Sequence, residues 1–281
     1  MVVAALGAAA PAQAAVTIGQ SPPPGAPVGC LAGTTWLQVS TAAGADYRVP
    51  PGGGVITQWQ HVQPPGPGGQ VVFVVFGPDV SGDHATTQAV SEVETVAAGA
   101  NSHAVRIPVS GGERIGIHAT AVALAACSYN TTFASDLALA NSFAPVVGES
   151  PPYGAISGRR VNVAAVIEDD EDNDDFGDES QDSCPVDNSI QVPCSPVVDK
   201  RPKKTSRSKK ATFAFHVPAG DGITFECQID KKEFAPCDSP VTFRKLKERK
   251  HTFRVRAKDG AGQVGGTVPV KFRVKLAGQG G

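Results

Sequence analysis

Gln70-Val-Val-Phe-Val-Val-Phe76 is an unbroken apolar run set between the turn-rich segments Gln63-Pro-Pro-Gly-Pro-Gly-Gly-Gln70 and Gly77-Pro-Asp79. Its odd and even positions are both apolar, which predicts a central β-strand covered on both faces. Further short apolar runs, separated by Gly- and Pro-rich breaks, occupy residues 34–39, 54–62, 89–96, 104–109, 114–119 and 160–167. Regularly spaced short strands predict an all-β fold, with a jelly-roll-like β-sandwich over residues 16–167.

The last third of the chain shows a cleaner strand pattern. Phe253, Val255 and Ala257 share one face of a predicted strand, and basic residues alternate with them. Apolar residues also alternate in the runs that begin near residues 213, 223 and 268, and in the run near 268 the opposite face is again basic. Apolar residues on one face and basic residues on the other predict a small antiparallel β-sandwich over residues 200–276. Residues 277–281 are expected to form a disordered tail.

The net charge of −2 conceals three regions of different charge. Residues 1–165 carry 5 basic and 8 acidic residues, for a net charge of −3. Residues 166–199 carry 12 acidic residues and no basic ones, whereas residues 200–281 carry 20 basic and 7 acidic residues, net +13. These changes predict two domains joined by an acidic linker over residues 168–199.

Two features predict an exported protein. Residues 1–15 form an apolar stretch that ends in the small-residue pattern Ala12-Gln13-Ala14, typical of a signal-peptide remnant, although an Ala-rich tail is the alternative. Six cysteines allow 15 pairings, and their spacing favours Cys30–Cys127, Cys184–Cys194 and Cys227–Cys237. Zinc binding is disfavoured because no CxxC pair occurs. No run of 18 apolar residues occurs, so we expect no membrane insertion.

The acidic linker contains the one motif with a clear chemistry. It reads Asp170-Glu-Asp172-Asn-Asp174-Asp175-Phe176-Gly177-Asp178-Glu179-Ser-Gln181-Asp182-Ser-Cys184-Pro185. Carboxylates at loop positions 1, 3, 5 and 9, with a backbone carbonyl at position 7, are the way a short loop surrounds Ca²⁺. A solvated acidic linker without a metal is the alternative.

These residues resemble the calcium-binding repeats of the thrombospondin type 3 class, in which D-x-D-x-D-G-x-G-D leads to a closing Asp and then Cys-Pro. The resemblance covers about 16 residues and implies Ca²⁺ ligation by Asp170, Asp172, Asp174, the Phe176 carbonyl and Asp178. Asp175 stands where the class has Gly, so Asp175 must adopt a left-handed conformation. The closing ligand is either Gln181, at the expected position, or Asp182, one residue later.

The C-terminal domain suggests a family through two segments, Phe225-Glu-Cys227-Gln-Ile-Asp230 and His251-Thr-Phe-Arg-Val-Arg-Ala-Lys-Asp259. With Cys237, they resemble the Ig-like or fibronectin-type-III-like modules of secreted actinobacterial proteins. The resemblance spans about 75 residues and implies a stalk or adhesion module that has no catalytic residues.

We therefore expect a non-enzymatic, extracellular or cell-surface structural or adhesion protein with a Ca²⁺ site in its linker. No G-x-S-x-G, H-E-x-x-H or phosphate-binding Gly-rich motif occurs. One alternative is a carbohydrate-binding module in the first domain, with Trp36 or Trp59 stacking on sugar rings, although core packing is favoured for both. Another is polyanion binding by the basic domain. A cell-wall polymer or polysaccharide is the expected partner; nucleic acid is disfavoured because no aromatic residues are interleaved with the basic ones.

Overall fold

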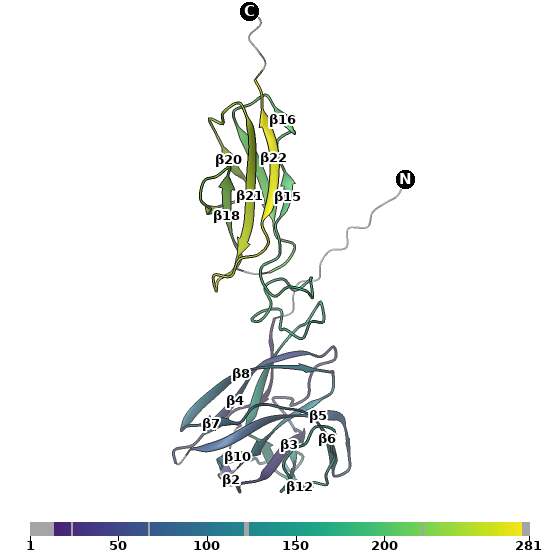
Figure 1. Ribbon diagram of the computed structural model, residues 1–281. Helices are drawn as coiled ribbons and strands as arrows, with labels where there is room; N and C mark the ends of the chain where they lie inside the picture. Colours follow the sequence, from purple (N-terminus) through teal and green to yellow (C-terminus); the bar gives the residue numbers. More distant parts are fainter. Residues whose placement is uncertain (1–13, 24, 67, 121–123, 221, 277–281) are drawn as a thin grey trace, which may run out of the picture. The chain divides into compact units, whose positions relative to one another are not determined.

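The computed structural model describes residues 14–23, 25–66, 68–120, 124–220 and 222–276. Within these ranges the chain forms β-strands and no helix, which confirms the all-β prediction (Figure 1). No helix there has the length and apolar character needed to cross a membrane. The predicted signal remnant at 1–15, apart from Ala14 and Ala15, and the predicted tail at 277–281 lie outside the described residues.

The chain divides into two compact units, of which the first ends at Asp170 and the second begins at Glu171. The acidic segment, which the sequence presents as a separate linker, thus belongs almost entirely to the second unit.

Two sheets of the first unit face each other. The four-stranded sheet has the order β1-β14-β4-β8, and the seven-stranded sheet runs β12-β11-β3-β9-β5-β6, with β7 also paired to β5. The strands of the first sheet are β1 (Val16–Gln20), β14 (Val163–Glu168), β4 (Gly54–Gln63) and β8 (Gly99–Val109). Those of the second are β12 (Gly154–Ser157), β11 (Leu137–Asn141), β3 (Thr34–Ser40), β9 (Arg114–Ala119), β5 (Gly69–Ser81), β6 (His84–Val90) and β7 (Glu94–Val96). A third sheet joins β13 (Arg159–Val161), β10 (Leu124–Asn130) and β2 (Ala26–Cys30).

Strand β5 is apolar on both sides because each side meets a separate core. Val71, Phe73 and Val75 lie in the core between the two large sheets. The intervening residues of the strand pack in a second cluster on the other face, together with Leu139 and Tyr153. The prediction of a central strand covered on both faces is therefore confirmed.

The second unit is a smaller sandwich. Its sheets run β15-β17-β20 and β16-β22-β21-β18-β19. The strands are β15 (Val197–Lys200), β16 (Thr205–Ser206), β17 (Ala211–His216), β18 (Thr224–Ile229), β19 (Ala235–Cys237), β20 (Val241–Phe243), β21 (Lys250–Lys258) and β22 (Val268–Val274). Phe213 and Phe253 stack at 4.0 Å between ring centroids in its core. Burial alternates along β21, which confirms the predicted apolar and basic faces.

Three disulfides join the cysteines in the pairs that their spacing predicts. Cys30–Cys127 links β2 to β10, and Cys227–Cys237 links β18 to β19. The third, Cys184–Cys194, closes a loop in the acidic segment. Disulfides of this kind are typical of extracellular and other oxidising environments.

Candidate metal centre

The acidic loop presents alternate side chains to its inner side. From Asp170 to Asp178, the even-numbered residues are partly buried, whereas Glu171, Asn173 and Asp175 are exposed. This period of two is the arrangement expected when a loop turns every second ligand inward. The predicted ligands at positions 170, 172, 174, 176 and 178 all lie on the partly buried side.

Three carboxylates come together at the start of the loop. Asp170, Asp172 and Asp174 each offer an oxygen, and these oxygens all lie within 4.8 Å of one another. Ca²⁺ binds oxygen at 2.3–2.6 Å, so two oxygens on one ion are separated by at most about 5 Å. The spacing of the three oxygens therefore fits a shared cation.

Two left-handed residues turn the backbone around this cluster. Asn173 has a φ of 58° and Asp175 a φ of 68°. Asn and Asp adopt this conformation more readily than other non-glycine residues. Asp175 thus takes the backbone conformation that the sequence requires where the thrombospondin type 3 class has Gly.

Hydrogen bonds across the loop fix its shape. The Asp178 carboxylate accepts the backbone N–H of Glu171, with Oδ2 at 3.1 Å from the nitrogen. Asp174 accepts the Phe176 N–H at 2.9 Å and the Gln191 Nε2–H at 2.8 Å. Both oxygens of Asp174 are thereby held in place, so the cluster is positioned by its surroundings as well as by the local chain.

Gln181 and Asp182 lie outside the three-carboxylate cluster. Their backbone N–H groups both donate to the Gly177 carbonyl, at 2.9 and 3.0 Å. The buried Asp182 carboxylate also accepts the Cys184 N–H at 2.8 Å. This contact connects the end of the loop to the disulfide. Ca²⁺ ligation stays a prediction for all of the residues that the motif selects.

The far end of the acidic segment is packed on the second unit. Ser183 Oγ donates to Asp259 Oδ2 at 3.1 Å. Gly265 approaches the segment so closely that a Cβ there would lie 1.9 Å from the Pro193 carbonyl oxygen. The acidic loop is therefore an extension of the second unit, attached through Ser183 and Pro193.

The two tryptophans do not form a sugar-binding surface. Trp36 is 8% exposed and Trp59 is fully buried, with its ring 5.8 Å from that of Phe73. This confirms that both tryptophans pack in the core. A stacking platform in the first unit has to come from another aromatic residue.

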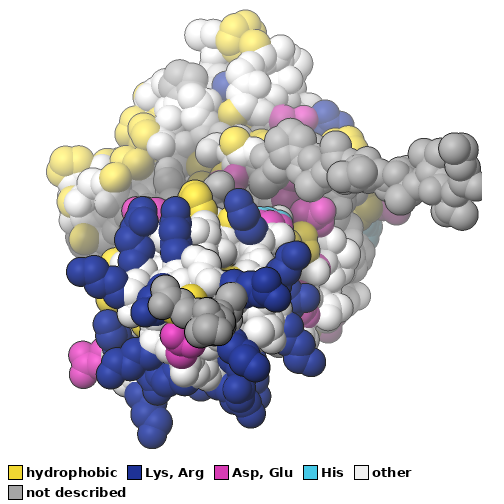
Figure 2. Space-filling model, turned by 90° about the horizontal axis from the view of Figure 1, so that it is seen from above, with side chains coloured by type: hydrophobic (Ala, Val, Ile, Leu, Met, Phe, Trp, Pro, Cys, Tyr) yellow, Lys and Arg dark blue, Asp and Glu magenta, His cyan; other side chains and the backbone are white. Residues whose placement is uncertain are grey.

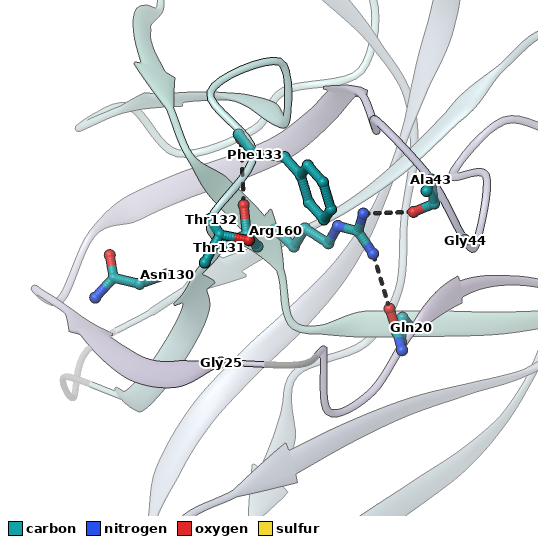
Figure 3. A pocket seen from close by; sticks show the side chains of 9 residues that line it. All are labelled: Gln20, Gly25, Ala43, Gly44, Asn130, Thr131, Thr132, Phe133 and Arg160. Carbon is teal, nitrogen blue, oxygen red and sulfur yellow. Dashed lines mark hydrogen bonds between the residues drawn. The ribbon is translucent and has the colours of Figure 1, made fainter.

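Phe133 is an aromatic residue that lines a pocket of about 440 Å³ in the first unit (Figure 3). Arg160 donates from Nη1 to Gln20 Oε1 at 3.4 Å and from Nη2 to the Ala43 carbonyl. Phe133, which is 50% exposed, lies beside this guanidinium. Gly25, Gly44, Asn130, Thr131 and Thr132 complete the lining. Sequence reasoning missed this pocket because its residues come from four separate segments and share no motif.

A buried ion pair with Asp136 fixes the position of the Arg160 side chain. Its Nε lies 2.9 Å from Oδ2 of Asp136, and the side chains of Arg160 and Asp136 are 5% and 0% exposed. Burial opposes ionisation of Asp136, but hydrogen bonds from Arg160 and from the Ala42 N–H outweigh it and lower the pKa of this carboxyl. The pocket thus has a fixed cationic wall.

Comparison with known proteins gives structural neighbours only. No family model matches the chain, and no curated protein matches it. The fibronectin type-III domain of human fibronectin type III domain containing protein 3 is 18% identical over 32% of this chain and 92% of that domain, with a TM-score of 0.22. The extracellular domain of a hybrid two-component system from B. thetaiotaomicron is 11% identical, with a TM-score of 0.28.

A third neighbour is the Endo-D glycoside hydrolase domain of Streptococcus pneumoniae R6, at 10% identity and a TM-score of 0.22. The match to the B. thetaiotaomicron domain covers 71% of this chain and 25% of that domain. The match to the streptococcal domain covers 92% of this chain and 37% of that domain. With TM-scores of 0.28 or less, these matches carry no argument about this chain.

Proposed function

We propose that the chain is a non-enzymatic, secreted structural or adhesion protein whose acidic loop binds Ca²⁺. The observation that carries this proposal is the group of carboxylate oxygens from Asp170, Asp172 and Asp174 within 4.8 Å of one another. The period-two burial of the loop and the positive φ of Asp175 support it. Three disulfides support an extracellular site of action, where millimolar Ca²⁺ suits modules with dissociation constants of about 10⁻⁴–10⁻³ M.

Calcium would act on the connection between the two units. Ionised carboxylates held this close repel one another, and a divalent cation replaces that repulsion by attraction. Asp170 ends the first unit, and the rest of the loop is attached to the second. An ion bound here would order the covalent connection between the two units.

Calorimetric titration of the full chain with Ca²⁺, disulfides intact, tests this proposal. Asp172→Asn removes an inward charge and is expected to weaken binding at least about tenfold, because ligand charge sets the affinity of calcium loops. Asp175→Asn is the matched control, since it removes an outward carboxylate from the same loop and Asn tolerates the left-handed backbone. Equal losses in both variants, or no binding heat up to about 10 mM Ca²⁺, would reject the site.

We infer a second candidate function, carbohydrate binding, from the pocket of Figure 3. A half-exposed aromatic ring beside a fixed guanidinium and several amide and hydroxyl groups offers both stacking and hydrogen bonds to a sugar. Phe133→Ala should abolish retention of the chain on a polysaccharide matrix. Phe143→Ala removes a ring of similar exposure, 55%, that lies outside the pocket, and should leave retention unchanged. Retention that survives Phe133→Ala would exclude this function.

A further inference from the structure

A basic groove lies in the second unit between the end of β15 and the start of β17. Its volume is about 650 Å³. Within the described residues its lining contains no acidic and no aromatic side chain. Five of the lining residues are basic, namely Lys200, Arg201, Lys203, Arg207 and Lys210, and all five are exposed. Figure 2 looks onto the second unit and shows Lys and Arg side chains gathered around it, with few acidic ones.

Three arginines of β21 and of the turn before it, in the five-stranded sheet, are already bonded within the protein. Arg256 lies 2.6 Å from Glu226, and Arg249 lies 2.7 Å from Asp230. Arg254 donates to the Gln228 side chain at 2.8 Å. These contacts give the arginines of β21 and of the turn before it a structural role, because cross-strand pairs of this kind stabilise a sheet.

Among the residues that the structure describes, the groove cations have no such acidic partners. In the described part of the chain, none of the five forms an ion pair with an acidic residue, including those of the acidic segment in the same unit. Asp199, next to Lys200, is bonded to His216 at 2.8 Å. Five exposed cations that share one hollow without counter-charges produce a positive potential that attracts anions.

We propose that this groove binds a linear polymer that carries repeated anionic groups and no nucleobases. The cations follow the chain from residue 200 to residue 210, so several successive anionic groups can be contacted at once. The hydroxyls of Thr205, Ser206 and Thr212 also line the groove and can hydrogen-bond to oxygens of the ligand. Without an aromatic side chain the groove cannot stack bases, which disfavours single-stranded nucleic acid.

Binding of the full chain to defined polymers tests this proposal. Dextran sulfate, polygalacturonate and polyphosphate are the anionic probes, and neutral dextran is the negative control. EDTA is present throughout, so that the calcium loop does not contribute. We expect binding to the anionic probes that weakens as salt rises, and no binding to dextran. Comparison of the affinities for polygalacturonate and polyphosphate shows whether the groove prefers carboxylate or phosphate groups.

A matched pair of variants locates the site. Lys203→Gln with Arg207→Gln removes two groove charges and should weaken binding about tenfold, with a shallower salt dependence. Lys231→Gln with Lys232→Gln removes the same charge from exposed residues outside the groove and should change affinity less than about twofold. Both pairs should leave the melting temperature unchanged because all four side chains are exposed.

Three outcomes would overturn the proposal. The first is an absence of binding to every anionic probe at low salt. The second is an equal loss in both double variants, which would show that net charge alone attracts the polymer. The third is tighter binding of a 20-nucleotide single-stranded DNA than of all three anionic probes, which would contradict the exclusion of bases.

Discussion

At the scale of single residues, Asn162 decides how the chain passes between two sheets of the first unit. Its Nδ2 donates to the carbonyls of Val62 and Ala126, at 2.7 and 2.8 Å, and its Oδ1 accepts the Ser21 hydroxyl at 2.9 Å. Asn162 is fully buried and separates β13 from β14, which belong to different sheets. The sequence predicts one continuous strand here, because the alternation of Val161, Val163 and later residues is unbroken. The amide network that divides the strand is not visible in that pattern.

Replacement of Asn162 by Leu should destabilise the first unit by about 2–4 kcal/mol, because the buried carbonyl of Ala126 and the partly buried carbonyl of Val62 lose their donor. Urea unfolding of the full chain measures this loss. Asn188→Ala, at an exposed position, should change the stability by less than about 0.5 kcal/mol. A loss below about 1 kcal/mol for Asn162→Leu would show that the network is dispensable.

The Asp136–Arg160 ion pair predicts a pH dependence of stability. The folded state lowers the pKa of Asp136 below its ordinary value. Ionised Asp136 therefore contributes stability that is fully present above about pH 4 and is lost as the pH falls through the folded pKa. Asp136→Asn should be less stable at neutral pH, since it leaves a buried guanidinium without its counter-charge.

Thermal unfolding between pH 6 and pH 2, a range that brackets the ordinary pKa of Asp, checks this expectation. The wild-type melting temperature should fall more steeply towards acid than that of Asp136→Asn, so the two curves converge. Parallel curves over the whole range would show that the titration of Asp136 does not contribute to acid unfolding.

At the scale of elements, periodicity predicts the strands that bury large side chains and misses those built from small ones. The runs at 54–62, 70–76 and 114–119 correspond to β4, β5 and β9. Strands β2, β10, β11 and β12 lie outside the predicted set, because their Ala and Gly residues give weak β-propensity. The predicted strand at 89–96 is also two strands, β6 and β7. Ser91 separates them by accepting the Phe73 N–H on its hydroxyl at 3.0 Å.

The attachment of the acidic segment depends on a close approach at Gly265. A Cβ at this position would lie 1.9 Å from the Pro193 carbonyl oxygen, so Gly265→Ala must displace the segment. We expect a cost of about 1–3 kcal/mol, as is usual when extra volume enters a packed contact. Gly260→Ala is the control, because a Cβ there meets nothing within 4 Å.

Thermal unfolding of the second unit compares the two glycine variants. Gly265→Ala should lower the melting temperature, and its Cys184–Cys194 disulfide should become more accessible to a reductant. If the two variants melt together, the segment does not depend on this contact, and the attachment must rest on other residues.

At the scale of the whole molecule, the charge pattern predicts more of the organisation than the net charge of −2 does. The change from acidic to basic residues near Lys200 locates the boundary between the acidic segment and the second sandwich. The motif predicts that Asp170, Asp172 and Asp174 lie together, because alternate positions in a tight loop share one side. It does not predict that the segment is attached to the second unit, since that depends on contacts with Asp259 and Gly265, far along the chain.

The pocket lined by Phe133 and Arg160 and the basic groove differ in how far the sequence indicates them. The groove is lined mainly by one basic stretch, residues 200–210, so the composition of that stretch already indicates an anion-binding surface. The pocket combines Gln20 with Phe133 and Arg160, which lie more than 100 residues later in the chain, and only the folded sandwich brings them together. A distributed site of this kind has no local signal to detect.

Hydrogen exchange of the full chain with and without Ca²⁺ tests the central claim most directly. The claim is that the acidic loop binds the ion and is ordered by it. Backbone amides of Glu171, Phe176, Gln181 and Asp182 already donate hydrogen bonds within the loop. Millimolar Ca²⁺ should slow their exchange at least about tenfold, leave the cores of both units unchanged, and have a clearly smaller effect on the loop of Asp172→Asn. Exchange in the loop that is identical with and without about 10 mM Ca²⁺ would contradict the claim.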